Sequence, residues 1–303
     1  MRRAIFLLLI ALAASTLYSP PAATSPAAPL NGIGLVDFAR KPTFKVGDWV
    51  KYRLTGKSEL GMSDDYEVTV LIAGEQDFWG DPAFWLETWS DMPGRPPETQ
   101  AALMSYAIFG DTAAVQRLQL YMRAVVSELN EDGTPRIEIV KPAASILKTR
   151  REVKNPVRWT RDTLGVDTVQ TPKGTFHAHK VLFKQGTGAT QTVGDSSVYT
   201  EVRENRTTWV VEEVPITHIA REDIESVGAG KSWLVGRSGE ASTLNIRDRG
   251  LGTARLIDFG HGLEARLLPV HLRHSIAEQE AAERAAARRK PVANRSATGK
   301  PNH

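Results

Sequence analysis

Two histidines separated by one residue are the clearest candidates for chemistry in the sequence. His177 and His179 lie in "TPKGTFHAHKV" (residues 171–181), where apolar and polar residues alternate after a turn of Pro, Lys and Gly. In a β-strand, residues i and i+2 point to the same face, so both imidazoles would share a face. Two ligands of one metal ion could therefore come from this stretch.

A metal site on this pair would need further ligands from other strands, because catalytic zinc commonly has three protein ligands. The residues that could complete it are His218, expected in another strand, and a carboxylate such as Glu201 or Glu212. The alternative is a solvated strand face with two imidazoles, placed after a tight turn that starts a long strand. We expect this alternative, and we predict no metal and no cofactor.

Other motifs also fall short of a catalytic site. "ESVGAGKSW" (225–233) has Glu225 where a phosphate-binding loop needs its first glycine, and "GLGTARLIDFGHG" (250–262) has Arg255 where a dinucleotide-binding motif needs its third. We expect a flexible loop and a hairpin turn there. We expect three carboxylate pairs to be exposed to solvent at turns or strand edges: Asp64-Asp65, Glu212-Glu213 and Glu222-Asp223. No G-x-S-x-G elbow is present, so we predict no catalytic residue.

Aromatic and methionine side chains are the better functional clue. Such side chains suit an adaptable apolar cavity, and they equally suit a plain core. The residues that we predict to bind a ligand are Trp85, Trp89, Met104, Phe109 and Met122.

The elements that must position these residues are mostly strands. Short alternating segments between Gly, Pro and Asp turns indicate an antiparallel meander that begins near Phe44. In "FWLETWSD", Phe84 and Leu86 would lie on one face, and Trp85, Glu87 and Trp89 on the other.

The middle of the chain changes period. Good helix formers predict a helix over residues 98–110, and apolar residues at helical spacing predict another over 111–133. Residues 118–122 would also fit a strand.

The two ends differ from the body. A basic head and an apolar run from Ala4 to Ala14 predict a secretory signal peptide over residues 1–23, or an uncleaved anchor. A flexible lead-in is predicted for 24–43, the folded domain for 44–272, and a basic Ala-rich helix with a disordered tail for 273–303. The chain has no cysteine, so neither disulfides nor a lipoprotein anchor is expected. We therefore expect a periplasmic or secreted bacterial protein.

The net charge of +3 comes from those ends, and the body is slightly acidic. A nucleic-acid-binding body should carry a basic face, so nucleic acid is excluded as a partner.

Four stretches, in this order, resemble the outer-membrane lipoprotein carrier superfamily, the LolA/LolB-like half-barrels: "VGDWVKYRLTG", "FWLETWSD", "TPKGTFHAHKV" and "TTWVVEEVPITHI". The resemblance spans residues 44–259. It implies a mainly β (α+β) fold, in which an antiparallel sheet curls into an unclosed barrel with two or three covering helices and an interior that takes acyl chains.

The expected function is a non-catalytic exported protein that binds a lipid or another apolar ligand in a half-barrel cavity. One alternative is a structural or interaction subunit of a cell-envelope assembly, with the basic tail contacting a membrane surface or an envelope protein. A metal-dependent envelope hydrolase is the other alternative.

Overall fold

The computed structural model describes residues 33–36, 38, 40–59, 61, 63–78, 80–93, 98–111, 114, 118–129, 135–140, 158–193, 196–235 and 241–268. These residues form one antiparallel sheet with three short helical turns. The predicted signal peptide and the predicted basic tail lie outside the described residues.

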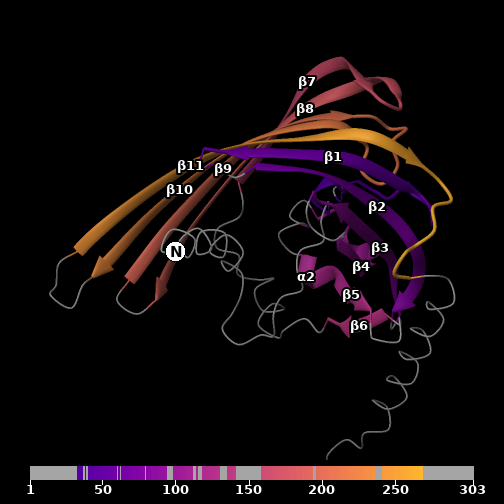
Figure 1. Ribbon diagram of the computed structural model, residues 1–303, viewed down its shortest axis with the longest axis horizontal. Helices are drawn as coiled ribbons and strands as arrows, with labels where there is room; N and C mark the ends of the chain where they lie inside the picture. Colours follow the sequence, from indigo (N-terminus) through magenta and orange to yellow (C-terminus); the bar gives the residue numbers. More distant parts are fainter. Residues whose placement is uncertain are drawn as a thin grey trace, which may run out of the picture.

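The sheet has eleven strands in the order β6-β5-β4-β3-β2-β1-β11-β10-β9-β8-β7. Figure 1 shows it bending over as an arch, with the helix α2 (Leu118–Tyr121) beneath. Pairing of β1 with β11 joins the two ends of the domain, while β6 and β7 form the edges. The strands are β1 (Trp49–Ser58), β2 (Ser63–Phe78), β3 (Asp81–Asp91), β4 (Glu98–Ser105), β5 (Met122–Leu129), β6 (Pro135–Ile139), β7 (Arg158–Thr171), β8 (Gly174–Val193), β9 (Ser196–Val210), β10 (Ile219–Val235) and β11 (Ala241–Gly260).

The predicted mainly β class and the open antiparallel sheet are confirmed, but the predicted covering helices are wrong. Residues 98–105 form β4, and only the 3-10 turn η2 (Tyr106–Ile108) follows. In the second predicted helix, the described residues 118–129 form only the short helix α2 and then β5. Both faces of β4 are buried, so its apolar residues do not alternate with polar ones and resemble a buried helix.

The glycine-rich motifs also lie in strands. Residues 225–233 belong to β10, and residues 250–260 belong to β11. The predicted loop and hairpin turn at these places are therefore wrong. The tight turn after Thr171 is confirmed, because Pro172 and Lys173 alone connect β7 to β8.

Two apolar cores lie on opposite faces of the sheet. We call the face of Val50, Tyr52 and Val68 the inner face, because α2 packs on that side. The outer face carries a second cluster, which includes Leu71, Trp85 and Leu103 from β2, β3 and β4. The alternation predicted for β3 is confirmed by this division.

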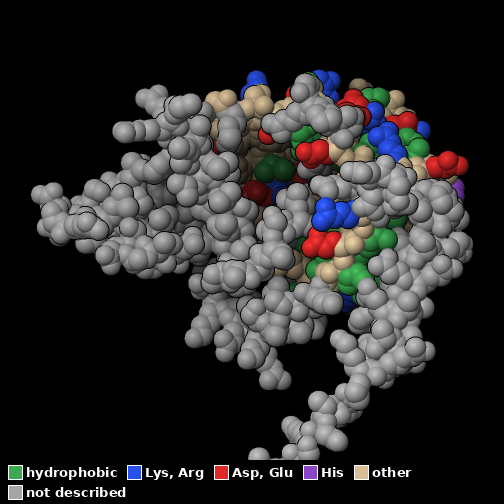
Figure 2. Space-filling view, turned by 60° about the horizontal axis from the view of Figure 1, so that its bottom comes forward, with side chains coloured by type: hydrophobic (Ala, Val, Ile, Leu, Met, Phe, Trp, Pro, Cys, Tyr) green, Lys and Arg blue, Asp and Glu red, His purple; other side chains and the backbone are tan. Residues whose placement is uncertain are grey.

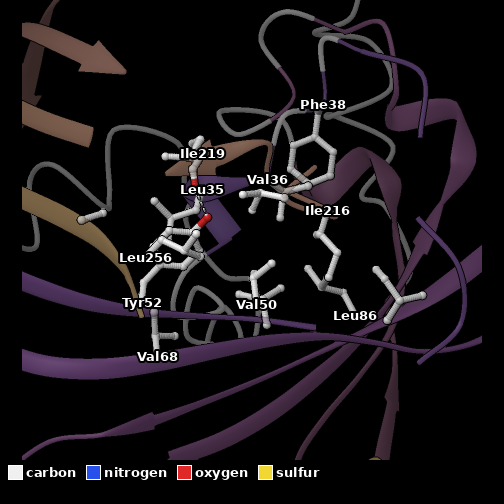
Figure 3. Packing of buried hydrophobic residues seen from close by; sticks show 14 of the residues in the cluster. Leu35, Val36, Phe38, Val50, Tyr52, Val68, Leu86, Ile216, Ile219 and Leu256 are labelled. Atoms are coloured by element: carbon white, nitrogen blue, oxygen red, sulfur yellow. Dashed lines mark hydrogen bonds between the residues drawn. The ribbon is translucent and has the colours of Figure 1, made fainter. Parts of the chain in front are cut away.

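The inner core under β1, β2 and β3 is filled by the protein's own side chains. Figure 3 shows Val50, Tyr52 and Val68 pointing toward side chains from the segment before β1 and from the connection before β10: Leu35, Val36, Phe38 and Ile216. The 3-10 turn η1 (Ile33–Leu35) begins that first segment. The described part of the chain has no helix long and apolar enough to span a membrane.

Candidate functional site on the inner face

One row of the inner face runs across six strands beside the core. Cross-strand pairing aligns Tyr66, Leu54, Ala254, Glu222, Thr208 and Val181. Directly opposed residues of an antiparallel sheet share a face, and Ala254 belongs to the inner core. Glu222 therefore points to the inner face, and it is only 3% exposed. A carboxylate thus occupies the middle of a largely buried row.

The two oxygens of Glu222 have different surroundings. Oε1 accepts a hydrogen bond from the Thr208 hydroxyl at 3.1 Å. Oε2 has no hydrogen-bond partner among the described residues, and Nη1 of Arg206 lies 3.6 Å from it. Burial raises the pKa of Glu222, and the opposing effects of Arg206 and Thr208 are smaller. The site therefore holds a carboxylate whose hydrogen-bonding capacity is incompletely used.

Arg206 lies in the next row of the same face and is shared between two carboxylates. Its Nε donates to Oε1 of Glu204, which also accepts from Nε2 of Gln185 at 3.2 Å. Burial alone would lower the pKa of Arg206, but Glu222 and Glu204 outweigh it and raise that pKa. The trio of Glu204, Arg206 and Glu222 consequently carries one positive and two negative groups when ionised.

Half-buried apolar side chains surround this trio. Ile224 and Phe183 are the cross-strand neighbours of Arg206, while Leu54 and Tyr66 extend the Glu222 row. Figure 2 looks in from beneath the arch and shows a hollow in which apolar, acidic and basic side chains are visible. Such a mixture of apolar surface and a few polar groups is typical of ligand-binding surfaces.

Tyr52 connects this site to the start of β10 and to the connection before it. Its hydroxyl donates to the carbonyl of Ile219 at 2.5 Å and lies 2.6 Å from the Thr217 hydroxyl. Burial raises the pKa of Tyr52, and the charge of Glu222 adds to that increase. The tyrosine is therefore held neutral beside the buried carboxylate.

The connection between β9 and β10, residues 211–218, has a strained backbone. Ile216 and His218 have φ angles of 67° and 54°, a region that β-branched and bulky residues rarely adopt. The amide of Val211 donates to the carbonyl of His218 at 2.8 Å, which closes the connection. Nε2 of His218 lies 3.2 Å from the Thr43 hydroxyl, so the buried ring ties the connection to the segment before β1.

The histidines do not assemble as a metal site would require. His177 and His179 are exposed on β8, whereas His218 is buried in the connection before β10 and not in a strand as expected. Within the described ranges, no group of three or more His, Asp or Glu side chains is placed to hold a metal ion.

The five predicted ligand-binding residues are divided between the two faces. Met104 belongs to the inner core, and Phe109 and Met122 pack against it with part of their side chains accessible. Trp85 and Trp89 belong to the outer cluster. The sheet separates these two groups, so they cannot contact one ligand together, and ligand contact by any of the five stays a prediction.

Trp89 instead borders a contact with the segment after β11. The guanidinium of Arg266 lies 4.3 Å from the centre of the Trp89 ring. Glu87, between the two tryptophans, accepts hydrogen bonds from the amides of Arg266 and Leu267. Burial raises the pKa of Glu87, and the backbone amides with the Arg266 charge offset part of that increase.

Sequence reasoning missed Glu222 as a site residue, because the Glu222-Asp223 pair was expected to be solvated at a strand edge. The pair in fact lies inside the sheet on β10, with its members on opposite faces. Asp223 is ion-paired with Arg221 and Arg255, whereas Glu222 is buried. The available signal was "AREDIES", where Ala220, Glu222 and Ile224 alternate with charged residues.

Comparison with known proteins gives low-level structural similarity only. No family model and no curated protein matches the sequence. Among solved structures, the chain is similar to a provisionally assigned exported protein with a YmcC-like fold from Bacteroides fragilis (9% identity, TM-score 0.29). That match covers 73% of this chain and 99% of the other. A provisionally assigned lipoprotein from Parabacteroides distasonis is 10% identical, with a TM-score of 0.30 and coverage of 74% and 99%.

A third similar structure is a LolA superfamily protein from Nitrosomonas europaea (8% identity, TM-score 0.24, coverage of 78% and 96%). It belongs to the superfamily that the sequence motifs resemble. At these identities and TM-scores, no residue role and no activity is transferred to this chain.

Proposed function

We propose that this protein is a non-catalytic, exported binding protein that holds a lipid or another apolar ligand against the inner face of its open sheet. The observation that carries the proposal is the half-buried apolar surface beside the filled core. Leu54, Ile224 and Phe183 lie on that face on β1, β10 and β8. Export rests on the predicted signal peptide.

The filled core restricts where the ligand lies. Under β1, β2 and β3 the inner face is packed against Leu35, Val36 and Phe38, so a ligand there would have to displace core side chains. The proposed site is therefore the part of the inner face formed by β1, β11, β10, β9 and β8. Met122 on β5 and Phe109 after η2 pack against the same inner core, away from the proposed site. They would contact the ligand only if it extends as far as η2.

The filled core also favours a second candidate, a structural or interaction subunit of the cell envelope. In that case the sheet is a scaffold, and its inner face needs no ligand. The basic tail proposed as the contact lies outside the described residues.

Native mass spectrometry of the detergent-free protein, followed by organic extraction, tests the binding function. We expect a non-covalent adduct whose mass matches an extracted lipid. Ile224→Gln places an amide in the apolar surface and should reduce adduct occupancy. Glu225→Gln changes the next residue, whose carboxylate pairs with Arg249 at 2.6 Å on the other face, and should leave occupancy unchanged. If the wild-type protein and both variants are recovered without ligand and bind no added lipid, the scaffold function is favoured.

A further inference from the structure

The polar trio of the inner face indicates what kind of head group a ligand would carry. Thr208 satisfies Oε1 of Glu222, but Oε2 accepts no hydrogen bond from any described residue. The side chain of Glu222 is only 4% exposed. A buried carboxylate that lacks a donor is costly, because it has lost its hydration without full replacement.

Arg206 does not fully compensate this carboxylate. Its Nε is bonded to Glu204, and its Nη1 approaches Glu222 only to 3.6 Å, beyond a normal hydrogen bond. One guanidinium therefore serves two carboxylates, and the ionised trio has a net charge of −1. The missing component is a hydrogen-bond donor with positive charge.

The side chains around Glu222 restrict the chemistry of the remaining part of such a ligand. Leu54 and Tyr66 share its row, and Ile224 follows on the same strand and face. All three are half-buried, so an apolar body placed beside Glu222 would cover surface that the protein itself leaves partly open. An anionic head group would meet the net negative charge of the trio and be repelled.

We propose that the ligand of this protein is an amphiphile with a protonated amine, which donates to Oε2 of Glu222 while its apolar chain lies along the inner face. This inference rests on the proposed binding function and narrows its ligand class. An aliphatic ammonium has three donors and stays charged at neutral pH, as the lysine side chain does. It would complete both the hydrogen bonding and the charge of the trio.

Binding of three ligands with the same alkyl chain to the full-length protein tests the proposal. The ligands are dodecylamine, dodecanol and dodecanoic acid, each below its critical micelle concentration and followed by intrinsic tryptophan fluorescence. We expect the amine to bind at least about tenfold more tightly than the alcohol, as expected for a hydrogen bond to a charged group. The acid should bind most weakly.

Variants assign this preference to Glu222. Glu222→Gln keeps the size and the Thr208 bond of the side chain but removes its charge, and should abolish the preference for the amine while keeping dodecanol binding. Glu225→Gln, on the outer face, should retain the full preference. Circular dichroism checks that each variant is folded. If Glu222→Gln does not fold, the order of the three affinities for the wild-type protein still tests the amine preference.

The failures of the two proposals are distinguishable. If dodecanol binds and the amine has no advantage, or if the preference survives in Glu222→Gln, the amine inference is wrong and the binding function stands. If none of the three ligands binds, both proposals are wrong.

Discussion

The carboxylate of Glu87 on β3 accepts a hydrogen bond from the backbone amide of Arg266 at 2.6 Å, which joins residues 179 positions apart. Its second oxygen accepts from the amide of Leu267 at 3.2 Å. Leu267 and Leu268 then pack in the outer cluster with Trp85 and Trp89. One buried carboxylate thus holds the segment after β11 against the outer face of the sheet.

Glu87→Ala should lower the free energy of unfolding by about 2–3 kcal/mol, because two backbone amides lose a charged acceptor. Urea denaturation followed by circular dichroism measures the change. Glu67→Ala is the matched control, since Glu67 is a surface residue in an ion pair with Lys51 and should cost under about 1 kcal/mol. Equal losses in the two variants would contradict the role of Glu87.

Tyr52→Phe should destabilise the protein by about 1–2 kcal/mol, because the buried carbonyl of Ile219 loses its donor. Thr217→Val removes the neighbouring hydroxyl, and the two changes should be non-additive by about 0.5–1.5 kcal/mol. A double-mutant cycle in urea measures this coupling. Strict additivity would mean that the two hydroxyls do not interact in solution.

The stability of the protein should carry a pH-dependent contribution from Glu222. Burial raises the pKa of this carboxyl above its ordinary value of 4.5, so the folded state binds its proton more tightly than the unfolded state. The associated stability is complete below pH 4.5 and is lost as the pH rises through the raised pKa. Glu222→Gln lacks this contribution and should therefore gain stability relative to wild type as the pH rises.

Urea denaturation of both proteins at several pH values between about 4 and 8 measures the difference. Asp65, Asp167 and Asp258, whose pKa values are lowered, add stability as the pH rises but contribute equally to both proteins. A difference that does not vary with pH would refute a raised pKa for Glu222.

Two glycines of the β7–β8 hairpin should respond oppositely to alanine. Gly165 has a φ angle of 111°, so Gly165→Ala should cost about 1–3 kcal/mol although the space around it is open. Gly186 also has open space and no such backbone requirement, so Gly186→Ala should stabilise the strand by about 0.5–1 kcal/mol. Thermal denaturation compares them, and a loss at Gly186 as large as at Gly165 would contradict the backbone explanation.

Local pattern was sufficient to predict much of the sheet. Alternation marked β1 through Val50, Tyr52 and Leu54, and Pro172 with Lys173 marked the turn between β7 and β8. The opposite faces of Phe84 and Trp85 also followed from alternation alone. These features depend on neighbouring residues, whose backbone geometry repeats every two positions.

Tertiary structure decided what alternation does not encode. Residues 98–105 became a strand because both faces of β4 are covered, which removes the polar positions that distinguish a strand from a helix. The predicted ligand residues Trp85 and Met104 were separated by the sheet itself.

The burial of Glu222 likewise depends on β9 and β11, which pair on either side of β10, and on the pairing of β11 with β1. β9 and β11 are next to β10 in the chain, whereas β1 is far from it. The alternation in "AREDIES" places Glu222 on one face with Ala220 and Ile224, but only the pairing of these strands encloses the carboxylate. The sequence by itself determined much of the sheet and, for strands such as β1 and β3, which residues share a face. Long-range pairing determined which polar groups lost their water, and with them the candidate site.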